Sequence, residues 1–194
     1  VAFCSVCFAV LLQPFIQLCF GGEYLLDYPV VIIIVANFAT NYVQNVVQIY
    51  KDASGLFVKG KYRAVMTAVL NLGISIILVK NIGLAGVFLG SIISRMVTTW
   101  WYDAWLLYRH GFHKSPLPYF RNCLSTMILI IVSTAIVQRF TLMWQGATWP
   151  DIVIKGILCV IVVNGIYLLI YGRSKEFRYL LSKVELILKK KSSL

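Results

Sequence analysis

Six runs of apolar residues, separated by short polar loops, constrain this sequence more than any other feature. Each run is close to the length of about 20 residues that an α-helix needs to cross a bilayer. Their approximate bounds are 1–20, 29–50, 63–80, 84–108, 122–138 and 152–171. In hydrocarbon a spanning segment must satisfy its own backbone hydrogen bonds, which an apolar run of this length does as a helix. The pattern therefore predicts an all-α integral membrane protein, a bundle of six transmembrane helices.

The composition excludes most soluble classes. Hydrophobic residues make up 60% of the 194 residues and charged residues 13%, and the mean hydropathy is +0.82. The net charge of +11 would favour nucleic-acid binding in a soluble chain. Here the cations cluster between apolar runs, so we expect no nucleic-acid partner. Val1 already belongs to an apolar run without a basic region before it, so we expect the C-terminal part of a longer protein.

Lysine and arginine are distributed unevenly among the segments between the runs. The basic segments are 51–63, 109–121 and 172–194, and the poor ones are 21–28, 80–83 and 139–151. The positive-inside rule places the basic segments in the cytoplasm. Six spans then leave both ends of this chain on the cytoplasmic side of a multi-pass protein. The last segment, 172–194, has apolar residues at helical spacing, so it is expected to be a basic amphipathic tail on the membrane surface or a solvated tail.

The second run carries four amides on one helix face. They are Asn37, Asn41, Gln44 and Gln48, spaced i, i+4, i+7 and i+11. Amides without partners are costly against lipid, so this face must contact other helices or a water-filled cavity. Asn71, between Thr67 and Ser75, repeats the pattern in the third run. Two interpretations stay open, namely hydrogen bonds between helices and a wet pathway suited to sugar hydroxyls.

A single cation, Arg95, lies deep inside the fourth run. It is about eleven residues from either end of 84–108, or roughly 16 Å along a helix, near the bilayer centre. Such an arginine normally faces the protein interior or water. It either contacts an anionic ligand, for which a diphosphate matches its forked donors, pairs with an acid on a helix that this fragment does not include, or extends to the interface. Asp103, two turns on, is expected to be an interfacial cap or part of an ion-coupling site.

Other motifs point to packing rather than chemistry. Gly86, Gly90 and Ser94 recur every four residues, which allows another helix to approach closely. The five cysteines all lie in apolar runs and are interpreted as small hydrophobic residues. His110 and His113 lack acidic or cysteine partners for a metal site. Because no phosphate loop, nucleophile elbow or catalytic carboxylate pair is found, we expect no enzymatic activity, no metal and no cofactor.

The loop 51–63 and its flanks resemble a known family. The segments concerned are FGGEYLL, YKDASGLFVKGKYR, LNLGIS around Asn71, and GLAGVFLGSIIS. In this order and spacing they resemble the C-terminal lobe of Wzx-type polysaccharide and O-antigen flippases of the multidrug/oligosaccharidyl-lipid/polysaccharide exporter superfamily. The resemblance covers about residues 12–120. Its motifs are short, and they indicate the family rather than a substrate.

The resemblance implies a transporter of about 12 to 14 helices in two lobes. Residues 1–108 would supply four spans of the C-terminal lobe, the first of them truncated, and 109–171 two further spans. Such proteins flip undecaprenyl-diphosphate-linked oligosaccharide units across the bacterial inner membrane for lipopolysaccharide or capsule assembly. The implied partners are the lipid-linked oligosaccharide, the membrane, the missing N-terminal lobe and a polysaccharide polymerase.

The resemblance and the polar residues together give two sets of candidate residues. The expected substrate pathway consists of Arg95, Asn37, Asn41, Gln44, Gln48 and Asn71. The expected contacts to the lipid head group are Lys51, Lys59, Lys61 and Arg63. Two other functions stay open. A polymerase or glycosyltransferase of the same pathway would usually need longer loops than these, and a multidrug exporter of the superfamily would not suit an unpaired central arginine if its substrate were cationic.

Overall fold

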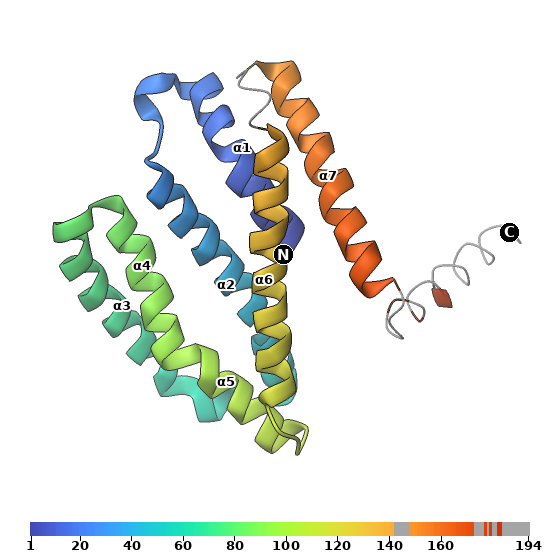
Figure 1. The fold of residues 1–194 in the computed structure, drawn as a ribbon. Helices are drawn as coiled ribbons and strands as arrows, with labels where there is room; N and C mark the ends of the chain where they lie inside the picture. Colours follow the sequence, from blue (N-terminus) through green and yellow to red (C-terminus); the bar gives the residue numbers. More distant parts are fainter. Residues whose placement is uncertain (142–147, 173–176, 178, 180–181, 184–194) are drawn as a thin grey trace, which may run out of the picture.

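The computed structural model describes residues 1–141, 148–172, 177, 179 and 182–183. Within these residues the chain forms helices and turns and no β-strand (Figure 1). The α-helices are α1 (Ala2–Phe20), α2 (Tyr28–Ala53), α3 (Lys61–Ile82), α4 (Leu84–Arg95), α5 (Trp101–Leu106), α6 (Leu117–Thr141) and α7 (Trp149–Tyr171). Two short 3₁₀ segments, η1 (Gly22–Tyr24) and η2 (Leu56–Gly60), precede α2 and α3. The predicted tail 172–194 lies largely outside the described residues.

Five helices among the described residues are long and apolar enough to cross a membrane. They are α1, α2, α3, α6 and α7. Each coincides with a predicted apolar run, and neither end of a helix lies more than about one and a half turns beyond the end of its run. Proline in the first turn of α2 and of α7 suits a helix start because its missing amide hydrogen would have no partner there. The prediction of an all-helical bundle of membrane-spanning length is confirmed.

The fourth predicted run, 84–108, is a helical path of changing pitch rather than one regular helix. Its segments are α4, the π-helical η3 (Met96–Trp100), α5 and the π-helical η4 (Leu107–Gly111). The Thr98 hydroxyl donates a hydrogen bond to the backbone oxygen of Ser94 at 2.6 Å. A hydroxyl in this position competes with a backbone amide for the same carbonyl. The wider π turn also changes the direction in which later residues face, and Asp103 lies just after it.

The connections between helices lie alternately at two ends of the bundle (Figure 1). The α1–α2 and α3–α4 connections lie at one end, whereas η2 and η4 lie at the other. The basic segments 51–63 and 109–121 therefore share an end. This arrangement is the one that the positive-inside rule requires of a multi-pass protein. The side of the membrane on which the basic end lies stays a prediction.

Helices α3 and α4 form a tight hairpin. Gly83 joins them with φ of 57°, a backbone conformation that residues with a Cβ atom rarely adopt. Gly86 and Gly90 are buried against α3. A Cβ atom on Gly90 would lie 2.9 Å from the Cα atom of Ser75. The predicted ladder of small residues is thus confirmed as a packing surface.

Helix α2 contacts both parts of the bundle. On one side, α1, α6 and α7 pack around a cluster made of Val6, Val10, Val137, Cys159 and Val163. Ala39 of α2 packs beside that group, against Ala2 and Ile130. Nearer its C-terminal end, Val47 of α2 packs against Ala104 and Leu107. These contacts fix α2 between the α1–α6–α7 group and the α3–α4–α5 group.

The glycine contacts predict different effects for two alanine substitutions in the α3–α4 hairpin. Gly90→Ala should lower the free energy of unfolding by about 1–3 kcal/mol, because the added methyl group overlaps the α3 backbone. Gly73→Ala is the matched control, since an added Cβ on this α3 glycine would meet nothing within 4 Å. Thermal unfolding in detergent can be followed through maleimide labelling of the buried thiols of Cys123 and Cys159. Equal melting temperatures for the two variants would contradict the close contact.

Candidate functional site

A polar groove lies between α2, α3 and the α4–η3 path. Its volume is about 280 Å³. The lining residues are Asn41, Gln44, Gln48, Arg63, Ala64, Thr67, Ala68, Asn71, Arg95 and Thr99. Five of the six predicted pathway residues are among them, drawn from three separate helices. Asn37, the sixth, lies one turn before Asn41 and hydrogen-bonds Arg95. The structure thus brings the predicted pathway residues together at one place.

Arg95 is held in the groove by neutral partners. Its Nε atom donates a hydrogen bond to the backbone oxygen of Ser91 at 2.9 Å. A terminal nitrogen of the guanidinium donates to the side-chain oxygen of Asn37 on α2. Within the described residues, the ion pairs of the structure do not include Arg95. Its positive charge is therefore oriented by an amide and a carbonyl and neutralised by no described carboxylate.

The polar residues of α3 bond across to α4 and η3. The Asn71 side-chain oxygen accepts hydrogen bonds from Ser75 at 2.9 Å and from Ser91 at 3.3 Å. One turn earlier, the Thr67 hydroxyl lies 2.7 Å from that of Thr98 and 3.2 Å from that of Thr99. Hydrogen bonds of this kind contribute about 0.6 kcal/mol each between membrane helices. They hold the side of the groove formed by α3 against α4 and η3.

The α2 amides behave differently from the α3 residues. Asn41, Gln44 and Gln48 all line the groove. Among the residues that the structure describes, their side chains have no hydrogen-bond partner in the protein. Amide groups without protein partners need water or a ligand with hydrogen-bonding groups. Of the two interpretations left open by the sequence, hydrogen bonding between helices applies to the α3 residues and to Asn37. An open polar cavity applies to Asn41, Gln44 and Gln48.

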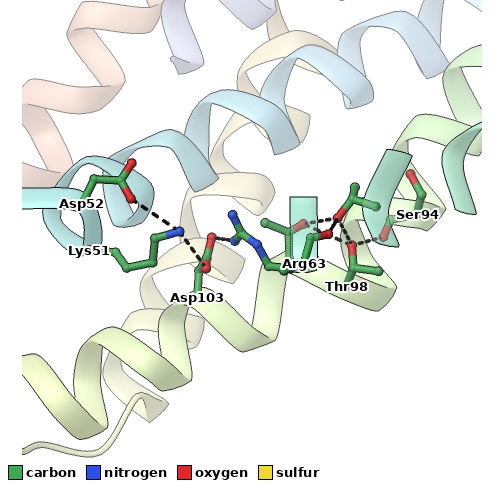
Figure 2. A network of polar contacts seen from close by, with 8 residues as sticks. Lys51, Asp52, Arg63, Ser94, Thr98 and Asp103 are labelled. Carbon is green, nitrogen blue, oxygen red and sulfur yellow. Dashed lines mark hydrogen bonds and ion pairs between the residues drawn. The ribbon is translucent and has the colours of Figure 1, made fainter. Parts of the chain in front are cut away.

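A buried cluster of charges adjoins the groove at the end that carries the basic loops. Figure 2 shows the carboxylate of Asp103 on α5 between Lys51 of α2 and Arg63 of α3. The Lys51 Nζ atom lies 3.2 Å from Asp103 Oδ1, and a terminal nitrogen of Arg63 pairs with Asp103 Oδ2. The side chains of Asp103, Lys51 and Arg63 are 0%, 3% and 13% exposed. We call these three residues the triad.

The triad carries one more positive charge than negative. Asp52 lies 3.6 Å from the Lys51 ammonium, but its side chain is 47% exposed, so solvent weakens its contribution. A buried carboxylate is stable only with close cationic or hydrogen-bonding partners. Asp103 has two cations, one on each oxygen. Because Arg63 also lines the groove, the surplus charge borders the same space as Arg95.

The residues predicted to contact a lipid head group separate into two kinds. The charged groups of Lys51 and Arg63 are engaged by Asp103 in the bundle interior. Lys61 is exposed, with its ammonium 4.8 Å from the centre of the Tyr62 ring. Lys59 lies in η2, and its side chain is outside the described part of the chain. For Lys61 and Lys59 a head-group contact stays a prediction, whereas Lys51 and Arg63 have another partner in this structure.

The triad was not predicted from the sequence, although a signal for it was present. Asp103 is the one acidic residue in the run 84–108. The predicted topology places it near the end of the bundle where Lys51 and Arg63 also lie. An acid in a membrane helix almost always pairs with a cation or faces water. Combining these statements would have predicted a partner among the cations of the basic loops, but the sequence cannot specify which of those cations point inward.

A second cavity has a different character. It lies between α1, α2 and α6 and has a volume of about 400 Å³. Aliphatic side chains such as Val31, Val35 and Ile130 dominate its lining, with Tyr28 and Gln138 among the few polar residues there. Its lining therefore has a single amide, Gln138, and no cation, unlike that of the polar groove. Within the described residues, no cluster of three histidine, cysteine or acidic residues could hold a metal ion.

The comparisons with known proteins add no identification. No protein family, curated protein or solved structure matches this chain.

The triad predicts a large effect of removing its carboxylate. Asp103→Asn should lower the free energy of unfolding by about 3–5 kcal/mol, because two buried cations lose their shared counter-charge. Asp52→Asn makes the same chemical change at an exposed acid and should cost at most about 1 kcal/mol. The thiol-labelling melt described above measures both variants. Similar losses for Asp103→Asn and Asp52→Asn would mean that Asp103 is not the ionic centre of the bundle.

Proposed function

We propose that this chain is part of a flippase for undecaprenyl-diphosphate-linked oligosaccharide units, acting in the bacterial inner membrane in surface polysaccharide assembly. The observation that carries the proposal is the polar groove, in which amides from α2 and α3 and the cation Arg95 line one space between helices of membrane-spanning length. The resemblance of residues 12–120 to Wzx-type proteins supports the class of substrate, a lipid-linked oligosaccharide, but does not specify its sugars.

The groove chemistry suits the polar part of such a substrate. Sugar hydroxyls both donate and accept hydrogen bonds, and so do the side-chain amides of Asn41, Gln44 and Gln48. The guanidinium of Arg95 adds donors that match phosphate oxygens. Ligand pockets usually measure about 300–1,000 Å³, so a groove of about 280 Å³ has room for one part of the substrate. The remainder would lie against the missing N-terminal lobe that the resemblance implies.

Topology supports the direction of the proposed transport. The basic connections at the η2–η4 end would face the cytoplasm, where lipid-linked precursors are made in the proposed pathway. A substrate head group entering from that end would meet the electropositive surroundings of Arg63 before it met Arg95. The expected partners are the substrate, the membrane, the opposing lobe and a polysaccharide polymerase.

The lining of the groove argues against the two alternatives. A polymerase or glycosyltransferase would need an acid, base or nucleophile facing the substrate. The titratable residues in the described lining are two arginines, Arg63 and Arg95, which stay protonated and cannot act as bases. A multidrug exporter that carries cations would place its substrate beside like charges. Transport of a substrate that combines neutral sugars with an anionic diphosphate fits this lining better.

The proposed role of Arg95 predicts a transport defect. In a strain lacking the intact gene, lipid-linked oligosaccharide should accumulate on the inner leaflet, and the wild-type gene should restore outward transport. Arg95→Ala should reduce the restored transport at least about tenfold, since a charged hydrogen bond to the substrate contributes about 1.5–3 kcal/mol. Lys80→Ala, which removes an exposed cation at the far end of α3, should restore transport fully.

Transport is measured by periodate oxidation of sealed spheroplasts followed by a membrane-impermeant hydrazide label. Full restoration by Arg95→Ala would keep the flippase and assign the arginine to structure. Oligosaccharide that reaches the outer leaflet without the gene would refute the proposed function and favour a membrane enzyme or a scaffold.

The amides that line the groove predict a second, smaller defect. Asn41→Leu and Gln48→Leu should each lower transport in the same assay, because leucine cannot replace the hydrogen bonds offered to sugar or water. Asn164→Leu is the matched control on α7, where the amide donates to the backbone oxygen of Val160 at 2.7 Å and does not line the groove. A loss of transport in Asn164→Leu as large as in the groove variants would show that the effect is not specific to the groove.

A further inference from the structure

Arg63 has two environments, and the pairing of the triad allows it to move between them. Its guanidinium pairs with Asp103, yet the residue also lines the polar groove. Its Nε atom is buried and has no hydrogen-bond acceptor among the residues described by the structure. A buried donor without an acceptor is destabilising. An anion in the groove would supply that acceptor as well as a negative charge.

Lys51 makes the departure of Arg63 possible. A carboxylate paired with a single cation would be left buried and uncompensated if that cation moved away, which costs several kcal/mol. Asp103 would instead keep Lys51, whose ammonium lies 3.2 Å from Oδ1 and is 3% exposed. The second cation is therefore the feature that makes the Arg63–Asp103 pair exchangeable.

The pair also ties together two helices, α3 and α5, at the end of the groove that carries the basic loops. Arg63 lies in the first turn of α3, directly after η2, and Asp103 lies in α5. In Figure 2 the Arg63 side chain extends from α3 toward the carboxylate, and Lys51 approaches that carboxylate from the other side. Loss of the Arg63–Asp103 pair would release the start of α3 from α5, whereas the Lys51–Asp103 pair would still hold α2 to α5.

We propose that the triad is a latch operated by an anion. In the arrangement of this structure Arg63 pairs with Asp103 and holds α3 to α5. A phosphate or diphosphate group in the groove draws Arg63 away, Lys51 keeps Asp103 neutralised, and the start of α3 is freed to move. The inference rests on the proposed function in one respect, which is that the groove admits an anionic group.

The test uses the intact gene product in phosphatidylcholine vesicles and hydrogen–deuterium exchange measured by mass spectrometry. One arm adds soluble inorganic pyrophosphate, a second adds farnesyl diphosphate to the vesicles, and potassium chloride at equal ionic strength is the reference. The latch predicts faster exchange in segments 61–66 and 101–106 with the diphosphate. A response to both probes shows that the diphosphate group alone is sufficient. A response to farnesyl diphosphate alone shows that the farnesyl chain is needed to bring the diphosphate into the groove.

Two glutamine variants separate a latch from a fixed structural contact. Lys51→Gln should lose at least about four-fifths of the rise in exchange caused by the diphosphate. Without Lys51, Arg63 cannot leave Asp103 unless the buried carboxylate loses its last cationic partner. Lys80→Gln removes an exposed cation from the opposite end of α3, away from the groove and the basic loops, and should respond like the wild type. Arg63→Gln should exchange fast without diphosphate and gain nothing from it, which supplies the test if Lys51→Gln does not fold.

Binding is measured separately, as the rise in melting temperature caused by each probe and its loss in Arg95→Ala. Absence of binding would overturn the latch together with the anionic site of the proposed function. Binding without faster exchange in the wild type would overturn the latch alone. An equal response in Lys51→Gln and the wild type would also overturn it, because the second cation would then have no part in the release.

Discussion

A buried carboxylate needs its counter-charge close by, and Asp103 imposes this requirement on the basic end of the bundle. Lys51 comes from the end of α2 and Arg63 from the start of α3, so one side chain on α5 draws three helices together. Such clusters add little net stability compared with apolar packing. They do favour one arrangement of the helices strongly, because any other arrangement would leave a buried charge without its partner. The arrangement also places Arg63 at the border of the polar groove.

The same requirement, applied to neutral polar groups, divides the groove into a fixed side and an open side. The hydroxyl and amide groups of α3 find partners on α4 and η3, as Thr67 does with Thr98 and Asn71 with Ser91. Gly86 and Gly90 permit the short approach that these contacts need. The α2 amides Asn41 and Gln48, by contrast, face the cavity. A membrane helix keeps such groups only where something polar can meet them.

Much of the fold could be predicted because hydrocarbon allows few solutions. Apolar length identifies the helices, and the distribution of lysine and arginine identifies which connections share an end. Spacing on α2 also predicts a polar face, because helix periodicity assigns Asn37, Asn41, Gln44 and Gln48 to one side without any knowledge of neighbours. These predictions depend only on the local sequence, which explains why they agree with the structure.

Contacts between helices could not be predicted in the same way. The sequence indicated that Arg95 needs a partner, but the partner, Asn37, is 58 residues away and neutral. Lys51 and Arg63 resembled ordinary loop cations, because nothing local distinguishes an inward-facing lysine from Lys61, which is exposed. The π-helical turn Met96–Trp100 alters the direction of Asp103, and its position depends on side-chain contacts such as that between Thr98 and Ser94 rather than on hydropathy.

The charge bias that orients the chain in the membrane also accounts for the triad's surplus cation. Positive-inside loops concentrate lysine and arginine at one end whatever the function of the protein. A carboxylate placed at that end can therefore recruit two cations, while one placed near the lysine-poor connections would find hardly any. The surplus positive charge then lies where α2, α3 and α5 meet, beside a groove whose other cation is Arg95. An anion entering from the basic end would pass the loop cations first and would then meet the two cations that line the groove, Arg63 and Arg95.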